Sequence, residues 1–181
     1  AIKGGQATGG GQEQWAFIPQ EFYPRFKRMR NQNPQLASTS TRDYFFDGPI
    51  TAYTKDATSN NSLGDSGDKV NLFIGLRRGG RMLYALDVTD PVVPKFLWKK
   101  GCTVTANGAA ATGYESSGVT CDAGFEELGQ TWSEPKLGYL RAYGNSKLVL
   151  IVGAGYDAPA EDLQPCGISA WNSTSVTGLT M

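Results

Sequence analysis

The chain has 181 residues, and its 17 basic and 17 acidic side chains cancel to a formal net charge of zero. A balanced charge excludes a global field that would recruit nucleic acid or an anionic membrane, and we find no apolar run long enough to span a bilayer. Histidine is absent, so Ser-His-Asp and Cys-His catalytic arrangements are excluded as well.

The first predicted element is a strand at Gln14–Pro19. Its sequence matches that of Leu83–Asp87 further along the chain, which predicts the inner strand of an early, partial β-sheet unit. A short helix is predicted next, over Phe22–Leu36, because Pro24 is suited to a first helical position.

Two groups of basic side chains accompany these elements. The first lies on the predicted helix, and the second flanks a glycine pair. Both are interpreted as solvated charges, and docking onto an acidic partner is the alternative interpretation. The residues are Arg25, Lys27, Arg28 and Arg30 in the first group, and Arg77, Arg78 and Arg81 in the second.

Arg77–Pro91 is the most informative segment of the chain. The pair Gly79 and Gly80 predicts a tight hinge between two buried strands. Asp87 and Asp90 predict a turn that closes the second strand.

Apolar runs of strand length lie on both sides of this segment. Val70–Gly75 precedes it, and Pro94–Lys99, which includes Trp98, follows it. Three short strands in close succession predict an antiparallel meander, which would form part of a propeller blade.

The polar loop Asp56–Asp68 is a candidate calcium site because oxygen-bearing side chains recur along it. It fails the EF-hand pattern, since Asn61 replaces the glycine at the sixth position and Gly67 replaces the glutamate at the twelfth. The composition predicts a mobile loop without a bound metal.

The pattern of a proline-led strand followed by a glycine-ended strand occurs twice. Asp47–Tyr53 leads to Leu72–Gly75, and Ser133–Tyr139 leads to Leu148–Gly153. Because four to eight blades close a propeller, we interpret the chain as a fragment of a single all-β propeller domain with about three blades' worth of antiparallel four-stranded sheets, a short helix and long loops. The predicted parts are a partial blade at 1–36, a blade at 44–100, a loop insertion at 101–124 and an incomplete blade at 129–181.

Three cysteines are present, and they are too far apart in the sequence for a zinc site without histidine. Cys102 and Cys121 bracket a segment rich in Gly, Ala, Thr and Ser. A disulfide that closes this segment is favoured over free thiols, which indicates a secreted or periplasmic protein. The partner of Cys166 is then expected outside the fragment.

Four aromatic side chains fall in or beside the predicted strands. They are Trp15, Tyr84, Trp98 and Trp132. Core packing is predicted for each, and a sugar-binding groove is the alternative.

Six segments, in their order along the chain, resemble the C-terminal propeller of the PilC/PilY type IV pilus proteins. They are Glu13–Pro19, Tyr44–Gly48, Phe73–Arg81, Tyr84–Pro91, Gly129–Pro135 and Val152–Asp157. The resemblance weakens between Cys102 and Cys121 and after Ala158.

This resemblance implies a large, exported protein at the bacterial cell surface, at the pilus tip or the outer membrane. Members of the family support pilus assembly, oppose retraction and take part in adhesion. The expected partners are minor pilins or other tip components and a host or abiotic surface. These are binding functions, so the resemblance implies no enzyme activity and no catalytic residue.

No cofactor or metal ligand is expected in this fragment. Members of the family often carry a calcium-binding loop, which is expected here only in the full-length protein. The stacked blades would present the long loops Asp56–Lys69 and Cys102–Cys121 for contact.

Two alternative functions remain. Tyr84–Asp90 with Trp98 also resembles the tryptophan-docking motif of quinoprotein dehydrogenases, which use pyrroloquinoline quinone, although the vicinal cysteine pair usual in those enzymes is absent. A propeller that serves only as an assembly scaffold in the cell envelope is the third interpretation.

Overall fold

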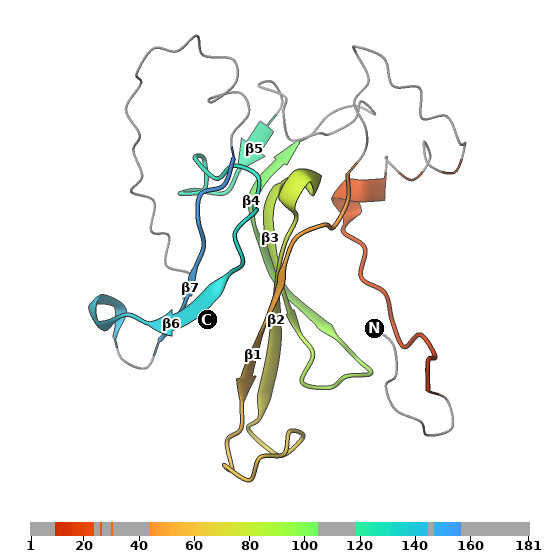
Figure 1. The fold of residues 1–181 in the computed structure, drawn as a ribbon, viewed down its shortest axis with the longest axis vertical. Coiled ribbons are helices and arrows are strands. Elements are labelled where there is room, and N and C mark those ends of the chain that lie inside the picture. The colour runs from red at the N-terminus through yellow and green to blue at the C-terminus, as the bar shows by residue number, and fades with distance from the viewer. Residues whose placement is uncertain are drawn as a thin grey trace.

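The computed structural model of the chain describes residues 10–23, 26, 30, 44–104, 119–144 and 147–156. These residues form two antiparallel β-sheets and three short 3-10 turns (Figure 1). The predicted all-β fold is confirmed.

The larger sheet is a five-stranded antiparallel meander in which neighbours in sequence are neighbours in space. The strands are β1 (Ile50–Lys55), β2 (Lys69–Gly75), β3 (Arg81–Asp87), β4 (Lys95–Val104) and β5 (Val119–Cys121). The strands predicted from the apolar runs are therefore present. A four-stranded antiparallel meander such as β1–β4 is the unit from which propeller blades are made.

Side chains in β2 and β3 alternate between the two faces of this sheet, as the pleat requires. Ile74 and Tyr84 are buried on one face, and Phe73 and Ala85 are buried on the other. Both faces are therefore covered, which explains why these strands are apolar along most of their length.

The smaller sheet consists of β6 (Lys136–Tyr139) and β7 (Leu148–Ile151), which are joined by the 3-10 turn η3 (Arg141–Tyr143). Leu150 of this sheet packs with Phe73 of the larger sheet. This region was predicted as an incomplete blade, and its described residues contribute two strands. In the described residues the two sheets do not close into a ring.

The other face of the larger sheet is covered by the N-terminal segment, which ends in the 3-10 turn η1 (Gln20–Phe22) (Figure 1). The prediction of a strand at Gln14–Pro19 is wrong, because these residues form no strand in the structure. Their side chains, rather than their backbone, contact the larger sheet and the loop after β3. The ring of Phe17 lies 5.9 Å from the ring of Tyr84, and the Trp15 indole N–H donates to the carbonyl oxygen of Pro91 at 2.8 Å.

The strand predicted at Pro94–Lys99 is longer in the structure, where β4 continues to Val104. The predicted loop insertion therefore begins within this strand. Cys102 of β4 lies opposite Cys121 of β5, and the structure joins this pair by a disulfide. This is the pairing that the sequence favoured. The base of the insertion is thus a short β-ladder closed by a covalent bond.

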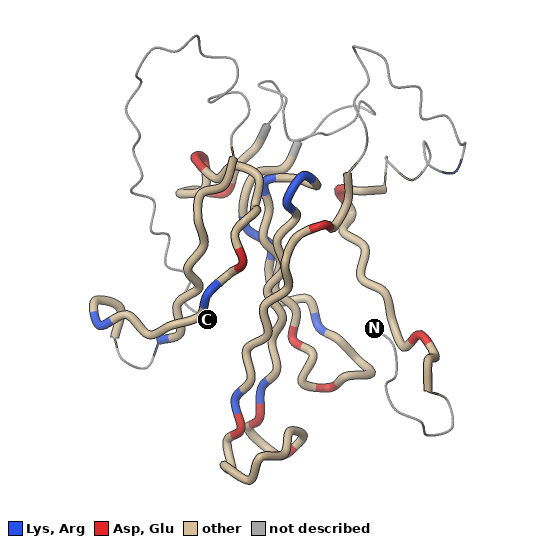
Figure 2. The backbone as a smooth tube through the Cα atoms, viewed as in Figure 1, with Lys and Arg blue, Asp and Glu red and all other residues tan. Residues whose placement is uncertain are grey.

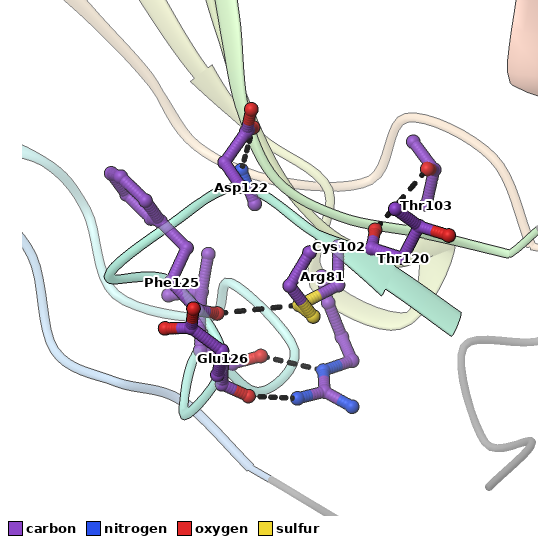
Figure 3. Close-up of a disulfide and its surroundings, with 10 residues drawn as sticks. Arg81, Cys102, Thr103, Thr120, Asp122, Phe125 and Glu126 are labelled. Atoms are coloured by element: carbon purple, nitrogen blue, oxygen red, sulfur yellow. Dashed lines mark hydrogen bonds between the residues drawn. A yellow bond between two sulfur atoms is a disulfide. The ribbon is translucent and has the colours of Figure 1, made fainter.

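The loop after the disulfide lies against Arg81 at the start of β3, as Figure 3 shows. The Arg81 guanidinium donates through Nε to the carbonyl oxygen of Leu128 at 2.6 Å and through Nη2 to that of Glu126 at 2.8 Å. Arg81 was interpreted as a solvated charge. It instead holds this loop in place.

Several predictions fall on other parts of the chain. Most of the predicted helix Phe22–Leu36, with Arg25, Lys27 and Arg28, lies outside the described residues, as does Cys166.

Candidate functional site

Four segments that are distant in sequence converge at the turn between β2 and β3. This turn is the 3-10 element η2 (Arg77–Gly79). Tyr44–Gly48, Gly129–Pro135 and the part of Val152–Asp157 that the structure describes lie against it or against one another. Segments that carry the family resemblance therefore meet at one place.

Close backbone contact explains the glycine at position 79. A Cβ atom there would collide with the carbonyl oxygen of Phe45. The Gly79 N–H donates to the carbonyl oxygen of Leu76 at 2.8 Å, and the Gly80 N–H donates to that of Arg77. The predicted glycine hinge is confirmed as a tight connection, and it is also a packing site for a distant segment.

Thr131 fastens this turn to the segment before β6. Its side chain is almost fully buried, with 1% of the residue exposed. The hydroxyl accepts from the Leu76 N–H at 2.7 Å and donates to the Met82 carbonyl oxygen at 3.1 Å. Its carbonyl oxygen accepts from the Arg77 N–H at 3.2 Å. The turn is therefore held from outside as well as by its own hydrogen bonds.

The segment that carries Thr131 is held in turn by the chain after β7. The Gly129 N–H donates to the Ala154 carbonyl oxygen at 2.6 Å, and the Gln130 N–H donates to that of Tyr156 at 2.7 Å. A Cβ atom on Gly155 would collide with the Gln130 carbonyl oxygen. The segment that carries Thr131 is therefore itself held in place by backbone hydrogen bonds to the chain after β7.

On the solvent side of the turn lies a surface that we call the arginine–tryptophan surface. It consists of Tyr44, Arg77, Arg78 and Trp132, and the buried Gln130 lies beside it. The guanidinium carbons of Arg77 and Arg78 lie 5.6 and 5.7 Å from the Trp132 ring centroid, and that of Arg78 lies 5.4 Å from the Tyr44 ring. These are cation–π distances.

Trp132 itself is 39% exposed, so the prediction that it packs in a core is wrong. Its indole N–H donates to Gln130 Oε1 at 2.9 Å, which fixes the orientation of the ring. The side chains beside this ring are the two arginines of the η2 turn. A cation is attracted to the face of an indole ring, and this attraction also operates at an exposed position. The other predicted core aromatics behave differently. Tyr84 is 1% exposed, and the Trp98 ring lies 5.9 Å from that of Phe73.

Neither Arg77 nor Arg78 forms an ion pair with a carboxylate among the residues that the structure describes. Both residues are exposed, and the backbone of the η2 turn is coloured blue for its basic residues in Figure 2. Arg78 also donates to the Tyr44 hydroxyl at 3.2 Å. The surface therefore offers two hydrogen-bonding cations beside an exposed aromatic ring.

The loop Asp56–Asp68, which the composition predicts to be mobile, is the second candidate, and hydrogen bonds to its own carboxylates run through it. Asp68 is 3% exposed, and its carboxylate accepts from three backbone N–H groups of the loop. The donors are Ala57 at 2.9 Å, Gly64 at 2.9 Å and Asp65 at 2.8 Å. These bonds lower the pKa of Asp68. A composition typical of disorder thus forms a defined loop around a carboxylate.

Asp56 organises the first half of the same loop. Partial burial raises the pKa of its carboxyl, but hydrogen bonds led by the Asn61 N–H outweigh that effect, and the net pKa is lowered. The Asn61 N–H lies 2.7 Å and the Thr58 N–H 3.0 Å from the carboxylate. The carboxylates are satisfied by the loop itself. In the described part of the chain no group of three or more Cys, Asp or Glu side chains is arranged to hold a metal ion.

The aspartates predicted to close β3 form turns. Asp87 Oδ1 accepts from the Thr89 N–H at 2.9 Å, and Asp90 Oδ1 accepts from the Val92 N–H at 2.9 Å. The hydroxyl and N–H of Thr89 lower the pKa of Asp87, and Lys69 adds an ion pair at 3.5 Å. These residues shape the β3–β4 connection, which confirms the predicted aspartate turn.

The class that this geometry defines is an antiparallel β protein with a fastened surface turn and an ordered acidic loop. None of the described helical segments is long and apolar enough to cross a membrane. No family model matches the chain, and no curated protein matches its sequence.

Among solved structures, the C-terminal domain of PilY1 from Pseudomonas aeruginosa is similar to this chain. The TM-score is 0.44 and the sequence identity is 25%, over 81% of this chain and 22% of that one. This chain thus spans less than a quarter of the length of the solved structure. That structure belongs to the family that the six sequence segments resemble.

Sequence reasoning did not find the arginine–tryptophan surface. Arg77, Arg78 and Trp132 were each singled out, but separately and for other roles. The one available signal is that the Gly79 region and the Gly129–Pro135 segment both carry the family resemblance. Their contact is tertiary and leaves no periodic pattern in the sequence.

Proposed function

We propose that this chain is part of a non-enzymatic, type IV pilus-associated surface factor of a bacterium. In this proposal it supports pilus assembly, control of retraction and surface adhesion. Minor pilins or other tip components and a host or abiotic surface are its partners, at the pilus tip or the outer membrane.

One observation carries this proposal. The segments that resemble the pilus family lie in contact with one another, in two groups. Tyr44–Gly48, Phe73–Arg81 and Gly129–Pro135 meet at the η2 turn, and Glu13–Pro19 packs against Tyr84–Pro91. Motifs matched by chance along the sequence would have no reason to contact one another.

The mechanism is presentation on a rigid support. The β1–β2 loop is ordered by its own carboxylates, and the η2 turn is fastened by Thr131. A binding element that is already ordered loses less conformational entropy when it meets a partner. Both features favour stable contact and require no chemical step.

Loop replacement tests this proposal in the full-length protein in its bacterial host. Lys55 pairs directly with Lys69 and Val104 with Val119, so residues 56–68 and, separately, 105–118 can each be replaced by a two-residue Asn-Gly turn that fits a hairpin. We expect at least one replacement to reduce pilus number or surface attachment while the amount of exported protein stays normal. Unchanged piliation and attachment with both replacements would contradict the proposal.

The quinoprotein alternative is tested on the same protein. Pyrroloquinoline quinone and Ca²⁺ are added, and dye-linked alcohol oxidation is measured. We expect no turnover above that of the free cofactor. Reproducible turnover that depends on the protein would overturn the non-enzymatic proposal.

A further inference from the structure

We propose that the arginine–tryptophan surface is a docking site for an acidic segment of a protein partner. A glutamate or aspartate carboxylate of that segment would accept hydrogen bonds from Arg77 and Arg78, and a neighbouring apolar side chain would cover the Trp132 ring. This inference rests on the proposed binding function and names the chemistry of the partner at one site.

The charge at this surface is uncompensated among the described residues. Arg77 and Arg78 are exposed and form no ion pair there, whereas Lys69, Lys99, Lys100 and Lys136 each have a carboxylate partner. A guanidinium is a planar group with donors only, and its geometry matches a carboxylate. The ligand that fits is therefore an anion with at least two acceptor oxygens.

The two guanidinium groups are positioned before any ligand arrives. Both lie over the Trp132 ring, and that ring is fixed by the hydrogen bond from its indole N–H to Gln130. Arg78 is also placed by the hydroxyl and ring of Tyr44. Ordered arginine and tryptophan side chains lose little freedom on binding, and these residue types are enriched among the energetically dominant residues of protein interfaces.

The backbone of Arg77 points to a use for its side chain. Its φ angle is 49°, a conformation that favours glycine. Glycine is present at two other positions of the same turn, Gly79 and Gly80, so its absence at position 77 calls for an explanation. The conformation persists because the Arg77 N–H donates to the Thr131 carbonyl oxygen. A non-glycine residue held in a disfavoured conformation at a surface is a signal of function.

A buried donor lies beside the same surface. Gln130 is 2% exposed, and its Nε2 group has no hydrogen-bond partner among the residues that the structure describes, whereas its Oε1 accepts from Trp132. Buried polar groups without a partner are uncommon in native proteins. The neighbourhood is therefore rich in donors, as an acceptor-bearing ligand requires.

The observations favour a protein segment over a nucleic acid or an anionic glycan. Polyanions are bound through extended rows of basic side chains that neutralise several charges. Here the described residues place two arginines around one aromatic ring, and the net charge of the whole chain is zero. Such a site fits one carboxylate with an apolar side chain next to it.

The test is a titration of the 181-residue chain, labelled with ¹⁵N, with two blocked peptides. One peptide carries a glutamate between two leucines, and the other carries glutamine at that position. We expect the glutamate peptide to shift the Trp132 indole N–H and the Arg77 and Arg78 side-chain N–H signals in a saturable way. The glutamine peptide should bind about tenfold more weakly or worse, because hydrogen bonds to a charged acceptor are the stronger ones.

Three variants sharpen this titration. Arg77→Gly removes one guanidinium and suits the backbone angle, and Arg78→Gln removes the other, so each should weaken binding of the glutamate peptide about tenfold. Arg141→Gln removes an exposed arginine from the equivalent turn of the smaller sheet and should change nothing. The dispersed amide signals of the rest of each variant show that it is folded.

Equal binding of the two peptides would overturn the inference. So would unchanged binding in both Arg77→Gly and Arg78→Gln, or an equal loss in Arg141→Gln. Binding of heparin or single-stranded DNA without binding of the glutamate peptide would overturn it in favour of a polyanion. Failure in this titration and failure of the loop replacements in cells are separate results, because the titration involves no pili.

Discussion

The turns η2 and η3 have similar local chemistry and different surroundings. Each is a single 3-10 turn between adjacent antiparallel strands, each begins with an arginine, and each is followed by a glycine. In η3 every residue is exposed, and the described hydrogen bonds of the turn stay within the hairpin. In η2 the glycine is buried, and both arginines lie over Trp132.

Thr131 accounts for much of this difference. It lies 55 residues after Leu76, and its hydroxyl and carbonyl oxygen bind two successive N–H groups of the η2 region. No such residue is found at η3 in the described structure. A turn becomes a rigid platform when a distant segment satisfies its backbone, and the local sequence alone does not produce this result.

The largest expected effect comes from a methyl group at the buried glycine. Gly79→Ala should lower the free energy of unfolding by about 3 kcal/mol, because the new Cβ collides with the Phe45 carbonyl oxygen. Gly144→Ala is the matched change in η3, where the space is open and only the φ angle of 90° is unfavourable. It should cost about 1 kcal/mol. Urea unfolding of both variants gives the comparison, and equal losses would show that η2 is not packed as described.

A somewhat smaller effect is expected from the buried hydroxyl. Thr131→Val keeps the shape but removes the acceptor for the Leu76 N–H and the donor to the Met82 carbonyl oxygen. We expect a loss of about 2 kcal/mol in the free energy of unfolding.

Ser133→Ala is the control for this change. The Ser133 hydroxyl also bonds to backbone, accepting from the Gly153 N–H at 2.8 Å, but it is less buried. A loss of about 1 kcal/mol or less is expected there. If Thr131→Val were as mild as Ser133→Ala, the fastening of η2 would have to lie elsewhere.

The smallest and most local effect is expected from acid. Hydrogen bonds lower the folded pKa of Asp68 below its ordinary value of 3.8. Its contribution to the β1–β2 loop is therefore complete above that value and is lost only as the pH falls through the lower folded pKa. The amides of Ala57, Gly64 and Asp65 donate to this carboxylate, so their NMR signals should move below pH 3.8 and not above it.

The N–H groups of Leu76 and Tyr143 provide the reference for this titration, because they donate to a hydroxyl and to a backbone carbonyl oxygen. The amide signals of Leu76 and Tyr143 should stay in place while those of the loop move. Asp68→Asn should remove the transition at the three loop amides. A loop transition above the ordinary pKa, or one shared by the turns, would contradict the account of this loop.

The sequence predicted the strands of the larger sheet because their signal is local. Val70–Gly75 is apolar with strand length and is bounded by turn residues, and that pattern decides the conformation. Gln14–Pro19 has a similar composition, but the structure gives it no strand. Whether an extended segment finds a backbone partner depends on tertiary neighbours that its own sequence does not contain.

The site was harder to predict for the same reason. The composition of Asp56–Asp68 is typical of disorder, yet Asp68 collects three backbone N–H groups only after the loop has closed around it. Trp132 was assigned to a core because large aromatic residues usually pack there. Its position is decided by two arginines more than 50 residues earlier in the chain.

Amide hydrogen exchange tests the central claim about η2 most directly. The amides of Leu76 and Arg77 donate to Thr131, whereas those of Tyr143 and Gly144 donate only within η3. The account predicts that the η2 amides exchange about a hundredfold or more slowly than the η3 amides, because a fastened turn opens only with a larger part of the fold. Equal exchange rates in the two turns would contradict it and would remove the rigid support on which the docking surface depends.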